Sequence, residues 1–255
     1  MADVLVIACG GGANNALKKE AEEGAFPIER VTRDGSTIPI DDRLALSELF
    51  NSYRVIMPFS ILGGAVGSDA IGHIISCAKE AGCRVVSVFG IPMALEPERR
   101  RKALEMLPSL SSQSDCTMVL DMQKSMELNM EYDENKLWEN YIRMSDRMLA
   151  GTIGALIESM EGPFFTVFSE GLYSFVPFYD VLPVNAVLKS WDRMLFDSGH
   201  ARDGAVVMVG SNIKTPEIDD IKNQIVTRYG VMPEVLIRSD PDDSKVVVFR
   251  AMEPF

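Results

Sequence analysis

The sequence predicts an α/β protein with a parallel sheet flanked by helices, a long central helix and a small C-terminal α+β portion. Three observations indicate this fold class. Short apolar runs alternate with helix-forming segments through the first half of the chain, as in βαβ units. Two of these runs end in glycine-rich turns that lead toward helices. Apolar residues then recur at steps of three and four from 135 to 160, which is the spacing of one helix face.

Five strands are expected in the first half, each a short run of apolar residues. Strands of a parallel sheet are buried on both faces, so they need not alternate with polar residues. The expected strands are Val4–Cys9, Ile28–Val31, Arg54–Phe59, Arg84–Phe89 and Thr117–Leu120. The helices expected between them carry Ala, Leu and charged residues, which favour helix. These helices are Asn15–Glu23, Asp41–Phe50, Ala70–Ala81 and Glu98–Met106.

The composition changes after the long helix. Residues 161–204 are rich in aromatic residues and contain several prolines, and we expect a connector with one or two short strands. Residues 205–255 are expected to form the small α+β domain. Its predicted elements are strands at 205–209, 234–237 and 245–250 and a helix at 216–229. Asp240-Pro-Asp-Asp243 supplies turn residues between the last two strands.

Composition excludes several classes of function. The net charge of −12 over 255 residues argues against a nucleic-acid partner, because phosphate backbones are bound by clustered Lys and Arg. The four cysteines form no CxxC pair and only two histidines are present, so we expect neither a zinc site nor disulfides. The start of the chain lacks a basic leader, and no apolar stretch approaches the roughly 20 residues of a membrane span. We therefore expect a cytoplasmic protein with no transmembrane segment.

The two glycine-rich turns predict a phosphate-binding site. Glycine lets the backbone turn sharply and approach a ligand, and the free N–H groups at a helix start attract an anion. Both turns follow strands, so both should lie at the carboxyl edge of one sheet. The residues concerned are Gly10, Gly11, Gly12, Asn14 and Asn15 in the first turn, and Gly63, Gly64, Gly67 and Ser68 in the second. The alternative interpretation is two merely tight strand–helix turns.

The turns match neither the dinucleotide-binding (Rossmann) motif nor the Walker A motif of nucleotide-binding proteins. Asn15 stands where a dinucleotide-binding motif has its third glycine, and no Gly-Lys-Ser/Thr triplet is present. In their order and residues, the stretches Cys9-Gly-Gly-Gly-Ala-Asn-Asn15 and Leu62-Gly-Gly-Ala-Val-Gly-Ser68 instead resemble the phosphate-binding loops of the FtsZ/tubulin superfamily. The stretch Pro92-Met-Ala-Leu-Glu96-Pro-Glu-Arg-Arg100 resembles the FtsZ segment P-F-x-F-E-x-R-x-R. Gly151-Thr-Ile-Gly154 stands where FtsZ has G-V-Q-G.

This resemblance implies a function. Residues 1–160 would be a nucleotide-binding domain that takes GTP or GDP, with the need for Mg²⁺ left open. The glycines would cradle the phosphates, Asn14 and Ser68 would belong to the same site, and Asn15 would help to hold the nucleoside and to recognise the base. Glu96 would meet the ribose, Arg100 would approach the nucleotide, Tyr141 would stack on the base and Ser145 would stand at the base-reading position; Asn135 is a weaker candidate for the base. Head-to-tail association of identical subunits is a further implication.

The departures from the family pattern bear on activity. Val66 replaces a threonine and Asp69 replaces a glycine in the second turn. The FtsZ catalytic loop reads N-x-D-x-x-D, whereas the best match here is Asn185-Ala-Val187-Leu-Lys-Ser190, which keeps the asparagine and loses both acids. If the alignment with the FtsZ loop is shifted so that Asp192 matches one of its two acids, one acid is retained. Without a general base we expect weak or absent GTP hydrolysis.

Two other functions stay open at this stage. The first is an FtsZ-like scaffold whose nucleotide pocket has decayed, which would be favoured if the side chains of Val66 and Asp69 both point into the pocket. The second is a dinucleotide-dependent oxidoreductase, which needs an acid near the end of the second strand to hold a ribose. Glu29 is the only rough candidate for that acid.

Overall fold

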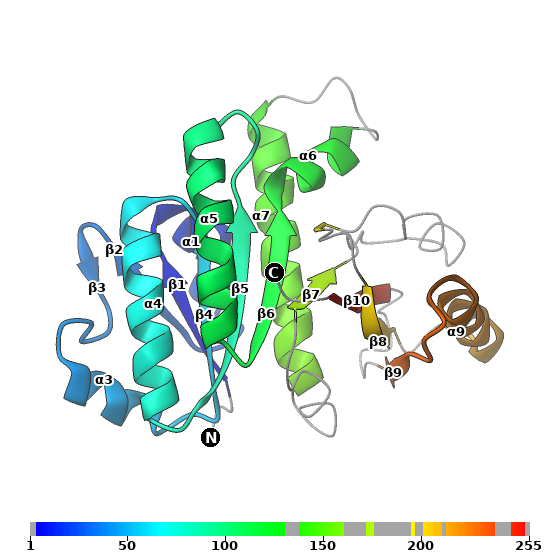
Figure 1. Cartoon of the computed structure of the whole chain (residues 1–255), viewed down its shortest axis with the longest axis horizontal. Helices are drawn as coiled ribbons and strands as arrows, with labels where there is room; N and C mark the ends of the chain where they lie inside the picture. The colour runs from blue at the N-terminus through cyan, green and yellow to red at the C-terminus, as the bar shows by residue number, and fades with distance from the viewer. Residues whose placement is uncertain are drawn as a thin grey trace.

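The computed structural model describes residues 4–130, 138–160, 172–175, 195–196, 201–210, 213–237 and 246–252. In this part of the chain the strands join in one sheet, with helices on both faces (Figure 1). The strands are β1 (Val4–Cys9), β2 (Ile28–Thr32), β3 (Gly35–Ser36), β4 (Val55–Ile61), β5 (Arg84–Ile91), β6 (Cys116–Asp121), β7 (Leu172–Phe175), β8 (Ala201–Val209), β9 (Glu234–Ile237) and β10 (Val246–Met252). Their order in the sheet is β3-β2-β1-β4-β5-β6-β7-β10-β8-β9.

The run β2-β1-β4-β5-β6-β7 is parallel throughout, which confirms the predicted fold class. Antiparallel pairs occur where β3 joins β2 and where β10 joins β7 and β8. The helices are α1 (Gly11–Ala16), α2 (Lys18–Glu23), α3 (Arg43–Phe50), α4 (Ala65–Glu80), α5 (Pro97–Gln113), α6 (Met122–Met130), α7 (Trp138–Met160) and α9 (Thr215–Tyr229).

Strand β1 explains why both faces need covering. Every residue from Val4 to Cys9 is buried. Because successive side chains point to opposite faces, Val6 and Ala8 join an apolar cluster with α1 and α7, whereas Leu5 and Ile7 join a second cluster with α3, α4 and α5. An apolar strand of this kind is stable only between two layers of helices.

Helix boundaries differ from the prediction at both glycine turns. The first helix begins at Gly11 rather than Asn15, and the fourth begins at Ala65 rather than Ala70. Glycine lowers helix propensity, yet Gly11 and Gly12 already form the start of α1, and Gly67 lies in the first turn of α4. Helix α6 was not predicted, and the predicted long helix at 135–160 is described from Trp138 as α7.

The C-terminal elements extend the same sheet. β10 pairs with β7, and β7 pairs with β6. α9, β8 and β10 enclose an apolar cluster of their own, which includes Val207, Ile221, Ile225 and Val248. The division of the chain at 160 and 204 remains a prediction, since most of 161–204 lies outside the described residues. β7 lies in this interval, where short strands were expected.

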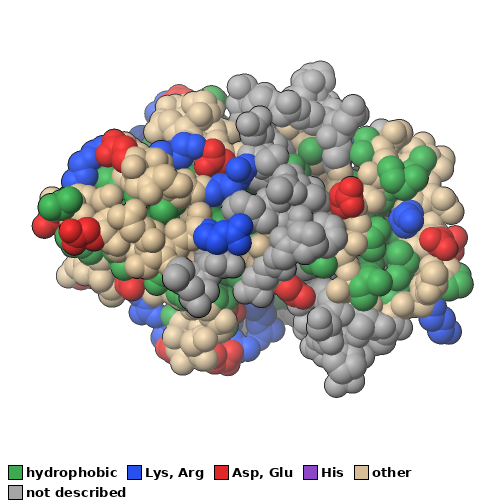
Figure 2. Space-filling view, turned by 90° about the horizontal axis from the view of Figure 1, so that it is seen from below, with side chains coloured by type: hydrophobic (Ala, Val, Ile, Leu, Met, Phe, Trp, Pro, Cys, Tyr) green, Lys and Arg blue, Asp and Glu red, His purple; other side chains and the backbone are tan. Residues whose placement is uncertain are grey.

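Figure 2 views the molecule from below relative to Figure 1, which is the side where the parallel strands begin. Figure 2 shows Lys and Arg side chains among Asp and Glu side chains on this face, rather than in one block. None of the helices in the described residues combines the length and apolarity that a membrane crossing requires.

Candidate functional site

The two glycine turns meet at the carboxyl edge of the sheet. Gly10 follows β1 and has a φ of 87°, a value that favours glycine. A Cβ built on Gly10 would lie 3.3 Å from Cα of Gly67, which is in the first turn of α4. A Cβ on Gly67 would in turn lie 2.8 Å from the carbonyl oxygen of Cys9 and would overlap Oγ of Ser60. Only glycines permit this approach.

Above the two turns lies an open cavity of about 430 Å³. We call it the glycine cavity. Its walls are the first turn, the start of α4, the loop after β2 and one arginine of α5. The lining residues include Gly10, Gly11, Gly12, Asn14, Asn15, Thr32, Arg33, Asp34, Gly64, Ala65, Val66, Gly67 and Arg99. The predicted convergence of the two turns is therefore present.

Asn14 and Ser68, both predicted site residues, form hydrogen bonds within the two glycine turns. The side-chain amide of Asn14 donates to the carbonyl oxygens of Gly10 at 2.8 Å and Ala8 at 3.1 Å. The backbone N–H of Gly63 donates to the hydroxyl of Ser68 at 3.1 Å. A Cβ on Gly63 would overlap the carbonyl oxygen of Arg99, so this glycine allows α5 to pack on the second turn. Asn15, by contrast, is exposed and lines the cavity.

A second cavity of about 420 Å³ adjoins the first. We call it the α7 cavity, because that helix forms one wall. It shares Gly12, Asn15, Ile61 and Arg99 with the glycine cavity, and its other lining residues are Pro92, Met93, Leu95, Glu96, Met122, Ile142 and Asp146. The glycine cavity is thus lined by glycine backbone, two arginines and the carboxylate of Asp34, whereas the α7 cavity is mainly apolar and carries two carboxylates.

The start of α5 brings Glu96 and Arg99 to the junction of the two cavities, where they form an ion pair. A Cβ on Gly64 would lie 3.8 Å from Nη2 of Arg99, so the guanidinium stands beside the second glycine turn. The predicted Arg100 lies outside both cavities. It forms a bidentate pair with buried Asp121, at 2.7 Å and 2.6 Å, and this pair raises the pKa of Arg100.

Among the described side chains of α7, two line the α7 cavity. Ile142 and Asp146, four residues apart on one helix face, line the α7 cavity. Ser145 is buried and accepts a hydrogen bond from Ser125 at 3.1 Å, away from the cavity. Tyr141 lies in α7, but its side chain falls outside the described part, as does Asn135.

Asp146, which lines the α7 cavity, has a raised pKa. Burial raises its pKa from 3.8 to about 6, because desolvation disfavours the charged carboxylate. Perturbed carboxyl groups in a cleft mark candidate functional sites. Sequence reasoning missed this residue, although an acid four positions after an apolar residue on the long helix was a readable signal.

The two replacements in the second turn are not both in the cavity. Val66 lines it, but also packs against the apolar cluster of α4 and α5. Asp69 is exposed and is not a lining residue of either cavity. Glu29 lies inside β2 and also lines neither cavity. Asn185, Val187, Ser190 and Asp192 lie outside the described residues.

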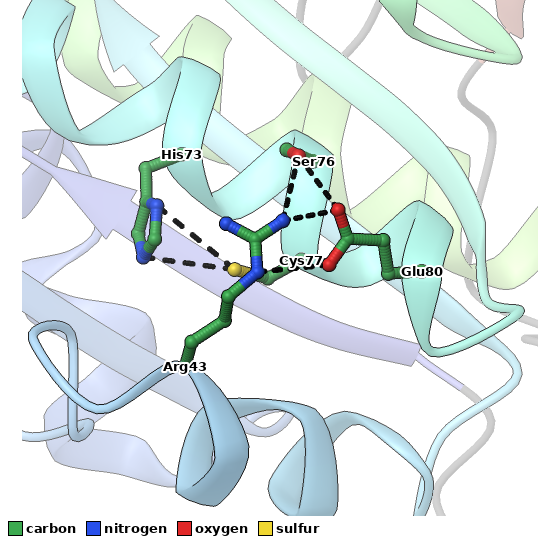
Figure 3. A network of polar contacts seen from close by, with 5 residues as sticks. All are labelled: Arg43, His73, Ser76, Cys77 and Glu80. Atoms are coloured by element: carbon green, nitrogen blue, oxygen red, sulfur yellow. Dashed lines mark hydrogen bonds and ion pairs between the residues drawn. The ribbon is translucent and has the colours of Figure 1, made fainter.

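A polar network between α3 and α4 is structural (Figure 3). Arg43 donates to Glu80 at 2.9 Å and to Ser76 at 3.3 Å, which fastens the two helices to each other. Cys77 lies 3.6 Å from a ring nitrogen of His73, but burial raises the pKa of its thiol and keeps it protonated. Within the described ranges no group of three His, Cys, Asp or Glu residues is placed to hold a metal ion.

A parallel α/β sheet with two glycine turns converging at its carboxyl edge, beside a long helix, is the arrangement of the FtsZ/tubulin fold. No family model matches the sequence. FtsZ of Aquifex aeolicus is 26% identical over 160 residues, which cover 49% of this chain and 44% of that protein. The chain spans 40% to 52% of the length of the curated relatives it matches.

Solved structures agree with the sequence comparison. An empty FtsZ dimer of Methanocaldococcus jannaschii superposes with a TM-score of 0.74 at 16% identity, covering 99% of this chain and 88% of that one. A GDP-bound CetZ1 monomer of Haloferax volcanii superposes with a TM-score of 0.70 at 12% identity, covering 99% and 94%. The predicted resemblance to the FtsZ/tubulin superfamily is confirmed: the chain has the FtsZ/tubulin fold and is similar in sequence to FtsZ.

Proposed function

We propose that the chain binds a guanine nucleotide, GTP or GDP, across the glycine cavity and the α7 cavity. The observation that carries this proposal is the meeting of the two glycine turns at one open cavity. Each cavity, at about 430 and 420 Å³, is within the size range of small-ligand sites, and they share four lining residues. Similar proteins include a CetZ1 described as GDP-bound.

The phosphates would lie over the glycine turns. α4 is 16 residues long, and Gly64 precedes it without a side-chain cap, so the first N–H groups of the helix are free to meet an anion. Gly11 leaves open space, because a Cβ built there would meet nothing within 4 Å. Arg99 adds a guanidinium beside Gly64. We propose that any Mg²⁺ would be held mainly by phosphate oxygens, as is usual in nucleotide sites.

The nucleoside would occupy the α7 cavity. Leu95 and Ile142, exposed by 68% and 39%, offer aliphatic surfaces to the faces of a base. Glu96 stands at the junction, where a ribose would lie. The carboxylate of Asp146 can accept from two adjacent donors, and guanine presents two N–H donors on one edge where adenine does not. Asp146 would therefore take the base-reading role that the resemblance assigned to Ser145.

The decayed scaffold is not favoured, because Asp69 lines neither cavity and Val66 is anchored on the core. We further propose slow hydrolysis, since the sequence at 185–190 lacks both acids of the FtsZ loop. Head-to-tail association is also proposed, on the ground that similar proteins are described as an FtsZ dimer and as TubZ protofilaments.

The test is to heat-denature protein purified without added nucleotide and to chromatograph the released small molecules. Release of GDP or GTP in near-stoichiometric amount supports the proposal. A matched preparation of a Gly11→Ala variant should release much less, because its methyl group would occupy the space of a phosphate. Absence of nucleotide from the natural chain, together with no calorimetric signal for GTP or GDP, would favour the decayed scaffold.

A further inference from the structure

The hairpin of β2 and β3 forms a wall of the glycine cavity that the sequence analysis did not foresee. Thr32, Arg33 and Asp34 at its tip all line that cavity. The hairpin is well tied: the Thr32 hydroxyl donates to the Gly35 carbonyl at 2.9 Å, and the Arg30 N–H donates to the Thr37 hydroxyl at 2.7 Å. Its tip is therefore held in a defined conformation.

The hairpin is also fastened to the first glycine turn. The backbone N–H of Gly10 donates to the carbonyl oxygen of Val31 at 2.8 Å. The side-chain amide of Asn14 reaches the same oxygen at 3.5 Å while holding Gly10 at 2.8 Å. The turn and the hairpin are thus parts of one hydrogen-bonded unit, and a ligand on the turn lies against the hairpin tip.

The position of the hairpin tip relative to the two cavities indicates which part of a bound nucleotide it would contact. The three tip residues line the glycine cavity and not the α7 cavity. The junction of the cavities is marked by the residues that they share, Gly12, Asn15, Ile61 and Arg99. A nucleotide with its base beside Asp146 would run through this junction, so its last phosphate would extend furthest toward the tip.

Charge then singles out Arg33. Two arginines of the described residues line the glycine cavity, and one of them, Arg99, is already paired with Glu96. Arg33 is exposed, and its side chain has no hydrogen bond or ion pair within the described residues. A guanidinium presents a planar fork of donors that matches phosphate oxygens. Asp34, the next residue, also lines the cavity, but its carboxylate would repel an anion, so Arg33 is the charged side chain of the tip that suits a phosphate.

We propose that Arg33 binds the terminal phosphate and makes the site prefer a nucleoside triphosphate to a diphosphate. This inference rests on the proposed nucleotide-binding function. It assigns to a hairpin arginine the discrimination between two and three phosphates.

The test is calorimetric titration of the full chain with GTP and with GDP, for the natural protein, Arg33→Gln and Arg30→Gln. Arg30 is the matched control, since it lies on the same hairpin and lines neither cavity. Losing a charge-assisted contact should weaken GTP binding by about 10-fold or more in Arg33→Gln and GDP binding by less than about 3-fold. Arg30→Gln should change neither by more than about 2-fold.

Equal weakening of GTP and GDP, or no weakening at all, would overturn the assignment of Arg33 while leaving the proposed function in place. Failure of the natural protein to bind either nucleotide would overturn both. Arg33→Lys, which keeps the charge and loses the fork, should restore part of the preference for GTP. Equal thermal midpoints for the two glutamine variants would show that the comparison is between folded proteins.

Discussion

Replacing Asp146 by asparagine should make the nucleotide-free protein more stable and its guanine site weaker. The pKa of Asp146 is raised from 3.8 to about 6. At 1.36 kcal/mol for each pH unit, burial of the charged carboxylate costs at most about 3 kcal/mol. Because the side chain is only partly buried, solvent screening reduces the expected cost to about 1 kcal/mol. Asparagine has nearly the same shape and carries no charge.

The sign of the effect depends on pH. The folded chain holds the Asp146 proton more tightly than the unfolded chain, so the cost is absent below about pH 4, grows as the pH rises toward 6, and is complete above 6. Asp146→Asn should therefore raise the thermal midpoint at pH 8 by about 2–4 °C and leave it nearly unchanged at pH 4. Asp69→Asn, an exposed acid outside both cavities, is the matched control.

Nucleotide binding should move in the opposite direction. Asp146→Asn should lower the affinity for GTP at pH 8 by about 10-fold, because asparagine offers one acceptor and a competing donor in place of the carboxylate. In the natural protein the affinity should fall as the pH drops below 6. Thermal unfolding followed by circular dichroism and calorimetric titration provide the two readouts. A lower midpoint for Asp146→Asn at pH 8, or an unchanged affinity, would refute this reasoning.

Three further predictions concern packing and turnover. Gly67→Ala should lower the free energy of unfolding by about 1–3 kcal/mol in a urea titration, since its Cβ would overlap Ser60, whereas Gly11→Ala should leave it unchanged or higher. Arg100→Ala should cost about 3 kcal/mol in the same assay by leaving Asp121 buried at 5% exposure and unpaired, and a loss below 1 kcal/mol would argue against that pair. GTP turnover per subunit should stay low and flat as protein concentration rises in a phosphate-release assay with parallel light scattering, whereas a rising rate would mean that the catalytic loop was misplaced.

The fold was largely readable from the sequence because its signals are local. Apolar runs and glycine turns follow each other along the chain, and parallel topology follows from their alternation. Helix α6 was missed because Met122–Met130 is short and mixes polar and apolar residues. Its place is set by Asp121, which accepts from the Gln123 N–H at 2.9 Å while pairing with Arg100. That pairing depends on residues distant in sequence.

The site was readable at its glycines and less so on its helices. Close approach of backbone needs glycine, so Gly10 and Gly67 could be identified from the residue type alone. Which helical side chain enters a cavity depends on how the helix rotates when it packs, and one residue corresponds to about 100° of rotation. Arg99 and Asp146 therefore line the cavities where neighbouring Arg100 and Ser145 were predicted.

The most direct test of the account is calorimetric titration of the purified, nucleotide-free chain with GTP, GDP and ATP at pH 8. Convergence of the two glycine turns, next to the cavity that Asp146 lines, predicts saturable heats for both guanine nucleotides and at least about 10-fold weaker binding of ATP. Absence of heat for GTP and GDP at millimolar concentration, with the chain folded by circular dichroism, would contradict it.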